Sequence, residues 1–248
     1  MIPKIIHFCW LSGDRYPAKI QYCIDSWKKM LPDYEIYLWD LNRFDISSSV
    51  WCKEAFEARK YAFAADYIRC LALYTYGGIY LDSDVEVLKS FDDLLSLPYF
   101  IGEEQGGNLE PAVMGCGKGW PVMKKMLEYY SGRHFIVDGE FDMETLPSLM
   151  SAMIREDWKY NRIMKPENFI DRPEVFCVLP AEYFSPKYPN GFRCPVTSAT
   201  YSIHHFAASW YPADKKLFRV VRRLFGYGVA HSMSVAAKGI MRFLSIKI

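Results

Sequence analysis

The stretch that decides the fold covers residues 61–84 and reads YAFAADYIRCLALYTYGGIYLDSD. With the residues before it, its first part predicts a helix over residues 54–76, because small and apolar side chains recur at the spacing of one helix face. Glycines at 77–78 end that helix, since glycine takes up the left-handed cap conformation without steric cost. The short apolar strand that follows places Asp82 and Asp84 at its carboxyl end.

The N-terminal part of the chain predicts a βαβ unit. Residues 4–10 are an apolar run typical of a buried strand, and Pro17 opens a segment whose apolar residues keep helical spacing as far as Leu31. Residues 34–39 are typical of the next strand. We therefore predict an α/β fold with a mostly parallel central sheet. Ligands of such sheets bind beside the carboxyl ends of the strands, where the two aspartates stand.

Further elements continue this pattern without an internal repeat or a linker before residue 212. We expect strands at 99–101, 112–114, 174–179 and 201–206, and helices at 120–130 and 144–158. We place one domain at residues 1–212 and a C-terminal helical extension at residues 213–248, where the composition turns basic.

Composition excludes several classes of protein. The 248 residues are 51% hydrophobic and carry a net charge of +1, so the chain has no overall attraction for nucleic acid. Its seven cysteines are scattered without a C-x-x-C pair, which argues against a disulfide framework or a zinc–thiolate site. The N-terminus lacks the pattern of a signal peptide, and no uncharged run reaches the roughly 20 residues of a spanning helix. We expect a cytoplasmic protein.

Two charged pairs carry the candidate chemistry. Asp82 and Asp84, one residue apart at a strand end, offer the carboxylate oxygens that Mg²⁺ or Mn²⁺ prefers. Asp66 and Arg69 are three positions apart and share a helix face. That second pair is either an intrahelical ion pair or a site that holds the hydroxyl and phosphate oxygens of a donor substrate.

The helix, glycine pair, strand and Asp-Ser-Asp segment resembles the signature of the sugar transferases that contain the DXD motif. This family includes fungal initiating α-1,6-mannosyltransferases and bacterial capsular polysaccharide transferases, and it is similar to the catalytic domain of large clostridial glucosylating toxins. Residues 2–10 (IPKIIHFCW) and 204–210 (HHFAASW) extend the resemblance. It implies a GT-A fold and a retaining hexosyltransferase that uses Mn²⁺ or Mg²⁺ and a nucleotide sugar, with UDP-sugars favoured.

The resemblance also implies roles for individual residues. The donor would be bound by His7, Trp10, Asp66, Arg69, Asp82, Ser209 and Trp210. The metal would be bound by Asp82, Asp84 and His205, with His204 as the alternative to His205. The catalytic set would be Asp66, Arg69, Asp82 and Asp84. Trp10 would lie beside the nucleotide base, although a tryptophan of the core is the other interpretation.

The acceptor cannot be carried over in the same way. Many relatives have a Thr-Gly-Pro step in the middle region, whereas residues 138–147 here read DGEFDMETLP. Glu103, Glu104 and Asn108 follow a predicted strand and would either line the acceptor pocket or form a solvated loop. By analogy with capsular enzymes we expect a glycan acceptor linked to a lipid, in surface or capsular polysaccharide synthesis.

The C-terminal extension contains eight Lys and Arg residues and no Asp or Glu from Lys215 to Ile248. Its apolar residues recur at helical spacing. Two interpretations stay open: a helix packed on the domain, or a helix on the cytoplasmic face of an anionic membrane.

Two other functions fit an Asp-x-Asp pair. One is a metal-dependent phosphohydrolase acting on nucleotide or sugar phosphates, but haloacid-dehalogenase-type enzymes place the pair after their first strand. The other is a catalytically silent membrane-binding module, which would have no need of the four charged residues Asp66, Arg69, Asp82 and Asp84.

Overall fold

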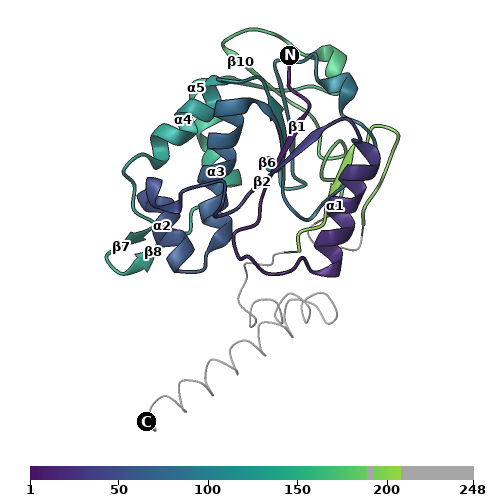
Figure 1. The fold of residues 1–248 in the computed structure, drawn as a ribbon. Helices are drawn as coiled ribbons and strands as arrows, with labels where there is room; N and C mark the ends of the chain where they lie inside the picture. The colour runs from purple at the N-terminus through teal and green to yellow at the C-terminus, as the bar shows by residue number, and fades with distance from the viewer. Residues whose placement is uncertain (189–192, 208–248) are drawn as a thin grey trace, which may run out of the picture.

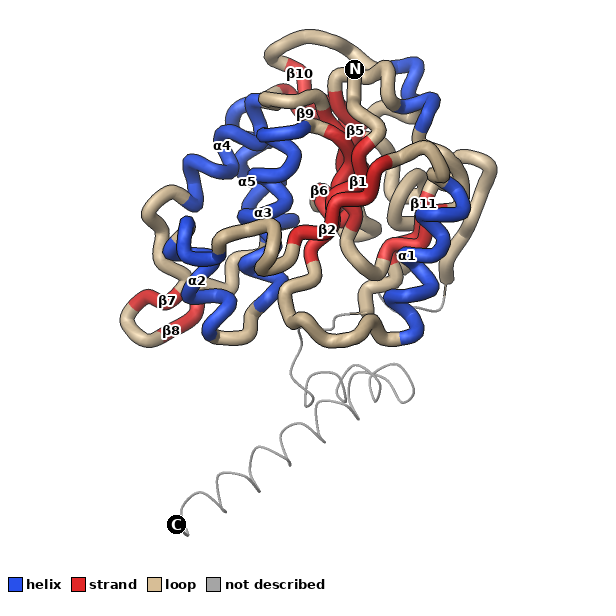
Figure 2. The backbone as a smooth tube through the Cα atoms, viewed as in Figure 1, coloured by secondary structure: helices blue, strands red, loops and turns tan. Residues whose placement is uncertain are grey.

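The computed structural model describes residues 1–188 and 193–207, and it contains a central sheet with helices on both sides (Figures 1 and 2). The sheet has the strand order β2-β1-β3-β6-β5. Its strands are β1 (Ile5–Cys9), β2 (Glu35–Trp39), β3 (Gly78–Leu81), β5 (Tyr99–Glu103) and β6 (Leu109–Cys116). β1 pairs in parallel with β2 and β3, whereas β6 is antiparallel to β3 and β5. Every strand of this sheet except β6 therefore runs in one direction, which confirms the predicted α/β class and its mostly parallel sheet.

Apolar side chains cover both faces of the sheet. On one face α1 (Ala18–Met30) packs Ile24 and Trp27 against Phe8 of β1. On the other face a second core collects helices α2 (Val50–Glu57), α3 (Tyr61–Tyr76), α4 (Pro121–Tyr130) and α5 (Leu146–Asp157). Figure 2 shows α1 on one side of the strands and α3, α4 and α5 on the other. The sheet is thus buried on both faces, as the apolar runs of its strands predict.

Three smaller strand pairs surround the sheet. They are β4 (Val85–Val87) with β11 (Ser202–His204), β7 (Ile136–Val137) with β8 (Glu140–Phe141), and β9 (Lys159–Arg162) with β10 (Val175–Val178). Single 3₁₀ turns lie at Ile46–Ser48, Asp92–Leu94 and Pro166–Asn168. The antiparallel pairing of β4 with β11 matters most, because it brings the last described strand beside the residues that follow β3.

The predicted helix over residues 54–76 is wrong in one respect, because it consists of two helices, α2 and α3. The break follows from a Schellman cap, in which the N–H of Lys60 donates to the carbonyl of Ala55 and the N–H of Arg59 to that of Phe56. Arg59 takes the left-handed conformation, with φ 56°. Glycine usually occupies this cap position, so an arginine there concealed the end of α2.

The backbone between α3 and β3 adopts a conformation that favours glycine at both positions. Gly77 has φ 67° and ends α3 by donating its N–H to the carbonyl of Leu73. Gly78 has φ 99°, and a Cβ atom there would lie 2.6 Å from the carbonyl oxygen of Ile5 on β1. The close approach of these two backbones lets β3 pair with β1 directly after the helix.

The C-terminal extension predicted over residues 213–248 lies outside the described residues, and so does the boundary near Pro212. Among the helices of the described part, none is long and apolar enough to cross a membrane.

We expect Gly78→Ala to lower the free energy of unfolding by about 3 kcal/mol or more. The alanine would be strained at this positive φ, and its Cβ atom would also collide with the carbonyl oxygen of Ile5. Gly13→Ala is the matched control, since Gly13 also has positive φ (72°) but a Cβ atom there would meet nothing within 4 Å. It should cost about 1 kcal/mol, the backbone part alone. Urea denaturation measures both. Equal losses would show that the contact with Ile5 does not constrain the turn.

Candidate active site

The order of the strands places a candidate site beside β1 and β3. The chain passes from β1 to β2 through α1 on one face and from β2 to β3 through α2 and α3 on the other. β1 and β3 are neighbours in the sheet, so the strand order reverses between them. Ligands of α/β sheets bind outside the carboxyl ends of the strands at such a point. Trp10 follows β1 there, and Asp82 follows β3.

Arg69 is the centre of the first half of the site. Its guanidinium lies 3.1 Å from a carboxylate oxygen of Asp66 and 3.1 Å from one of Asp82. A further N–H donates to the carbonyl of Pro111 at 2.9 Å, and the guanidinium lies over the ring of Tyr80. Arg69 is 5% exposed. Its Nε–H is buried and has no hydrogen-bond partner among the described residues.

Burial raises the pKa values of the two aspartates beside Arg69. It raises the pKa of Asp66 to about 7, although the positive charge of Arg69 opposes this shift. Burial also raises the pKa of Asp82, again against the attraction of Arg69. The Asp66–Arg69 pair is buried and reaches Asp82, so it is not a solvated pair on a helix surface.

His204 is the centre of the second half of the site. Its Nε2 lies 3.3 Å from a carboxylate oxygen of Asp84, and its Nδ1 lies 3.2 Å from a carboxylate oxygen of Glu110. The pairing of β11 with β4 aligns His204 with Val85, the residue after Asp84. The indole N–H of Trp27 on α1 donates to the carbonyl of Val85 and holds β4 in place.

The charges of this half stabilise one another. Burial disfavours the imidazolium form of His204, but Asp84 and Glu110 outweigh it and raise its pKa well above the ordinary value. Burial likewise disfavours the Asp84 carboxylate, yet the attraction of His204 and the N–H of Ala207 hold its pKa well below the ordinary value.

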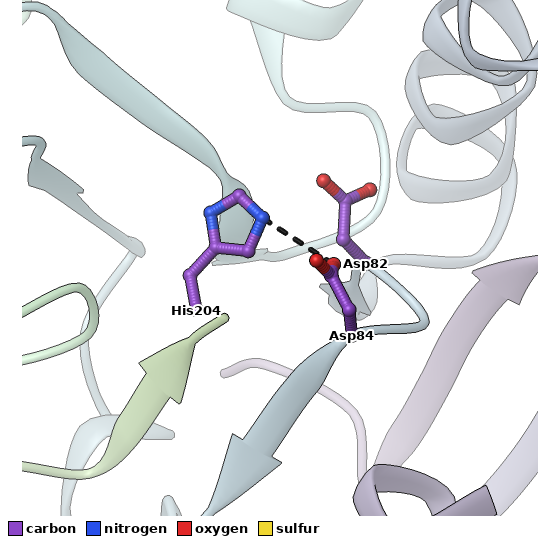
Figure 3. Close-up of side chains that lie close together, drawn as sticks. All are labelled: Asp82, Asp84 and His204. Carbon is purple, nitrogen blue, oxygen red and sulfur yellow. Dashed lines mark ion pairs between the residues drawn. The ribbon is translucent and has the colours of Figure 1, made fainter. Parts of the chain in front are cut away.

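Asp82, Asp84 and His204 form a candidate metal centre (Figure 3). One potential ligand atom from each residue lies within 4.8 Å of those of the other two. Carboxylate oxygens are the preferred ligands of Mg²⁺ and Mn²⁺, and imidazole binds transition metals well. This set of donors fits a divalent cation, with Mn²⁺ better suited to the imidazole than Mg²⁺.

The structure corrects the prediction that His205 completes the metal site. The ring of His205 lies 2.8 Å from a carboxylate oxygen of Glu86, and only its backbone N–H reaches Asp84, at the carbonyl oxygen. Successive side chains along an extended chain point to opposite sides. His204 therefore faces the aspartates, while the next residue faces away from them.

A second correction concerns His7, which was expected to bind the donor. His7 has no exposed surface, and its Nε2 lies 2.8 Å from the carbonyl oxygen of Gly77. Its Nδ1 accepts a hydrogen bond from the indole N–H of Trp39. Both ring nitrogens are engaged, so His7 ties β1 to β2 and to the turn before β3. Burial lowers its pKa to about 4.

Trp10 lies at the expected edge of the sheet and is partly exposed. Its indole N–H donates to the carbonyl of Asp14, and its ring meets that of Tyr16 edge to face. Its contact with a nucleotide base stays a prediction. Ser209 and Trp210 lie outside the described residues. The acceptor-side candidate Glu103 is buried, where it accepts a hydrogen bond from Tyr160 and pairs with Arg162.

Sequence reasoning missed Glu110 and Pro111, which contact both halves of the site. The signal was present, because Glu110 is the one charged residue of the strand LEPAVMGC. A charge in an otherwise apolar strand needs a partner, and a proline inside a strand is typical of a bulge.

Comparisons with known proteins match this chain to sugar transferases. Residues 17–101 match the family model described as "Glycosyltransferase sugar-binding region containing DXD motif". Inositol phosphoceramide mannosyltransferase 3 of Schizosaccharomyces pombe is 28% identical over 96% of this chain and 69% of its own length. Mannosyl phosphorylinositol ceramide synthase SUR1 of Saccharomyces cerevisiae is 29% identical over 89% of this chain and 55% of its own length. The solved PaToxG glycosyltransferase has a TM-score of 0.46, with 20% identity over 62% of this chain and 68% of its own.

These sequence matches confirm the resemblance to the DXD-motif sugar transferases. The family model matches residues 17–101, and the class of enzyme that the sequence relatives indicate is glycosyltransferase. They favour a glycosyltransferase over a phosphohydrolase. The chain spans about half the length of the Saccharomyces relative.

We expect the His7 ring to stay neutral down to about pH 4. Because its pKa is lower in the folded state than the ordinary 6.5, its contribution to stability is complete above pH 6.5 and is lost as the pH falls toward 4. The loss amounts to at most about 3 kcal/mol. Histidine NMR titration measures the pKa, and His7→Gln should flatten the stability profile in this range. A His7 ring that titrates above pH 6 would contradict the assignment.

We expect Arg69→Ala to lower the free energy of unfolding at pH 7 by about 3–5 kcal/mol, because Asp66 and Asp82 lose their buried partner. The loss should shrink at pH 5, where Asp66, whose pKa lies at about 7, binds a proton. Lys53→Ala, an exposed change on α2, is the control and should stay within about 0.5 kcal/mol. Denaturation at both pH values is the measurement. A loss that does not change with pH would argue against an ion pair at Arg69.

Proposed function

We propose that this chain is a retaining, divalent-metal-dependent glycosyltransferase that moves a hexose from a nucleotide sugar to a hydroxyl group of a lipid-linked acceptor. One observation carries the proposal. Asp82, Asp84 and His204 present ligand atoms to one another at the carboxyl end of β3, where a nucleotide ligand of such a sheet binds.

The residues present fit the metal that the DXD family implies. Asp82, Asp84 and His204 would hold it, and a bound divalent cation would neutralise the charge that develops on the leaving diphosphate. Asp84 is held in its ionised form by His204 and the N–H of Ala207. Asp84 is thus charged and oriented within the protein itself.

Arg69 supplies a second, fixed feature for the donor. Its position is set by Asp66, Asp82, the carbonyl of Pro111 and the ring of Tyr80. A buried N–H without a partner costs roughly 1–3 kcal/mol, so a sugar hydroxyl that accepts from the Arg69 Nε–H would be bound favourably. Because the guanidinium is already oriented, it need not reorganise when the donor binds.

The relatives guide the choice of substrates. Their names describe mannosyl transfer to inositol phosphoceramide, so we propose a mannosyl donor and a lipid acceptor with a hydroxylated headgroup. The resemblance to the DXD-motif family favours a UDP-sugar, and a GDP-sugar is the competing donor. A role in surface polysaccharide assembly and a cytoplasmic location with peripheral membrane contact are part of this proposal, because a lipid-linked acceptor must be reached at a membrane.

We expect Mn²⁺-dependent turnover with one member of a panel of UDP- and GDP-sugars, and a loss of about 100-fold or more in Asp84→Asn. A neutral amide is a much poorer ligand for a hard cation than a carboxylate. Sugar release and transfer to lipid acceptors, with and without EDTA, are the measurements.

Asp25→Asn is the control, because Asp25 is exposed on α1. Circular dichroism should show that both variants keep the fold. Full activity of Asp84→Asn in Mn²⁺, or turnover of the unchanged chain that EDTA does not affect, would refute the metal assignment.

A further inference from the structure

We propose that Glu110 is a positioning residue, which orients the ring of His204 so that its Nε2 faces the candidate metal site. This inference rests on the proposed metal-dependent function. Glu110 lies on β6 and is 4% exposed, and no ligand atom of the candidate metal centre belongs to it.

The geometry of the imidazole carries the proposal. The Nδ1 of His204 lies 3.2 Å from a carboxylate oxygen of Glu110, while its Nε2 points to Asp84. When Nδ1–H donates to a carboxylate, the lone pair of the neutral ring resides on Nε2. Histidines that bind metals usually have such a partner on the other nitrogen, which fixes the tautomer and the plane of the ring.

Glu110 is itself held in place. One of its carboxylate oxygens accepts the backbone N–H of Ala112, and the other accepts the hydroxyl of Ser185. A carboxylate is costly to bury unless its oxygens have partners. Here contacts from β6, from His204 and from Ser185 fix the carboxylate before any ligand binds.

An irregularity in β6 explains why this glutamate faces the site. The register with β5 changes from Ile101 opposite Met114 to Gly102 opposite Glu110, so extra residues of β6 bulge out between these pairs. β-bulges re-aim side chains and recur beside active sites. A proline fits there because it has no N–H to give to the sheet.

The same bulge serves the other half of the site. The carbonyl of Pro111 accepts from Arg69, and the carbonyl of Ala112 accepts the backbone N–H of Asp82. Glu110 is therefore fixed, through β6, relative to Asp82, one of the ligands with which His204 must align.

The test measures Mn²⁺ binding directly, by titration of the full chain with Mn²⁺ alone and detection of free Mn²⁺ by electron paramagnetic resonance. We expect Glu110→Gln to weaken Mn²⁺ binding by about 10- to 100-fold. Glu103→Gln is the matched control. Glu103 is a buried glutamate on the neighbouring strand β5 that bonds Tyr160 and Arg162, so its change should affect stability and leave Mn²⁺ affinity as it is.

A double variant shows whether Glu110 acts through His204. If it does, Glu110→Gln added to His204→Ala should weaken Mn²⁺ binding no further than His204→Ala alone. Ser185→Ala removes only one hydrogen bond of Glu110 and should weaken Mn²⁺ binding in the same direction but less. This variant keeps the test decisive if Glu110→Gln does not fold.

Two failures can be told apart. If the unchanged chain does not bind Mn²⁺, the proposed metal site is wrong. If the unchanged chain and Glu110→Gln bind Mn²⁺ equally well, the metal site is supported and the role of Glu110 is refuted. If Glu110→Gln does not fold, Ser185→Ala takes its place in this comparison. Losses that add up in the double variant would also refute it.

Discussion

The buried guanidinium of Arg69 is the constraint on which the rest of the site depends. A charge in this position is costly unless it is paired and hydrogen-bonded, and the fold meets that requirement from three directions. Asp66 comes from the preceding turn of α3, Asp82 from the end of β3, and the Pro111 carbonyl from β6. Any shift of β3 against α3 would break these contacts. The tight glycine turn between the two elements therefore helps to define the site.

Much of this arrangement could be predicted from local sequence. The spacing of Asp66 and Arg69 places both on one helix face, and the glycine pair marks the end of α3. The strand after it delivers Asp82 and Asp84 to the carboxyl edge. These features need only local rules, because the residues involved lie within one helix–turn–strand unit.

The features that sequence reasoning missed depend on contacts between distant segments. The choice between His204 and His205 depends on the phase of β11, which its pairing with β4 determines. His7 resembles a ligand in the sequence, yet Trp39 and Gly77 occupy both its nitrogens. The role of Glu110 depends on a register change in β6. The break at Arg59 is different in kind: it is local, but an arginine replaces the glycine that normally signals it.

The electrostatics of the two halves tie the proposed metal to the proposed donor. Arg69 already pairs with two carboxylates, so its half has no positive charge left over for a diphosphate. In the other half His204 lies between the carboxylates of Asp84 and Glu110, and Asp82 stands beside them. A diphosphate approaching these acidic groups alone would be repelled at short range, where screening by salt is weak. A divalent cation held by Asp82 and Asp84 reverses the sign of that interaction. The proposed nucleotide-sugar donor therefore requires the proposed metal. Evidence against a metal at Asp82 and Asp84 would also be evidence against a diphosphate-containing donor.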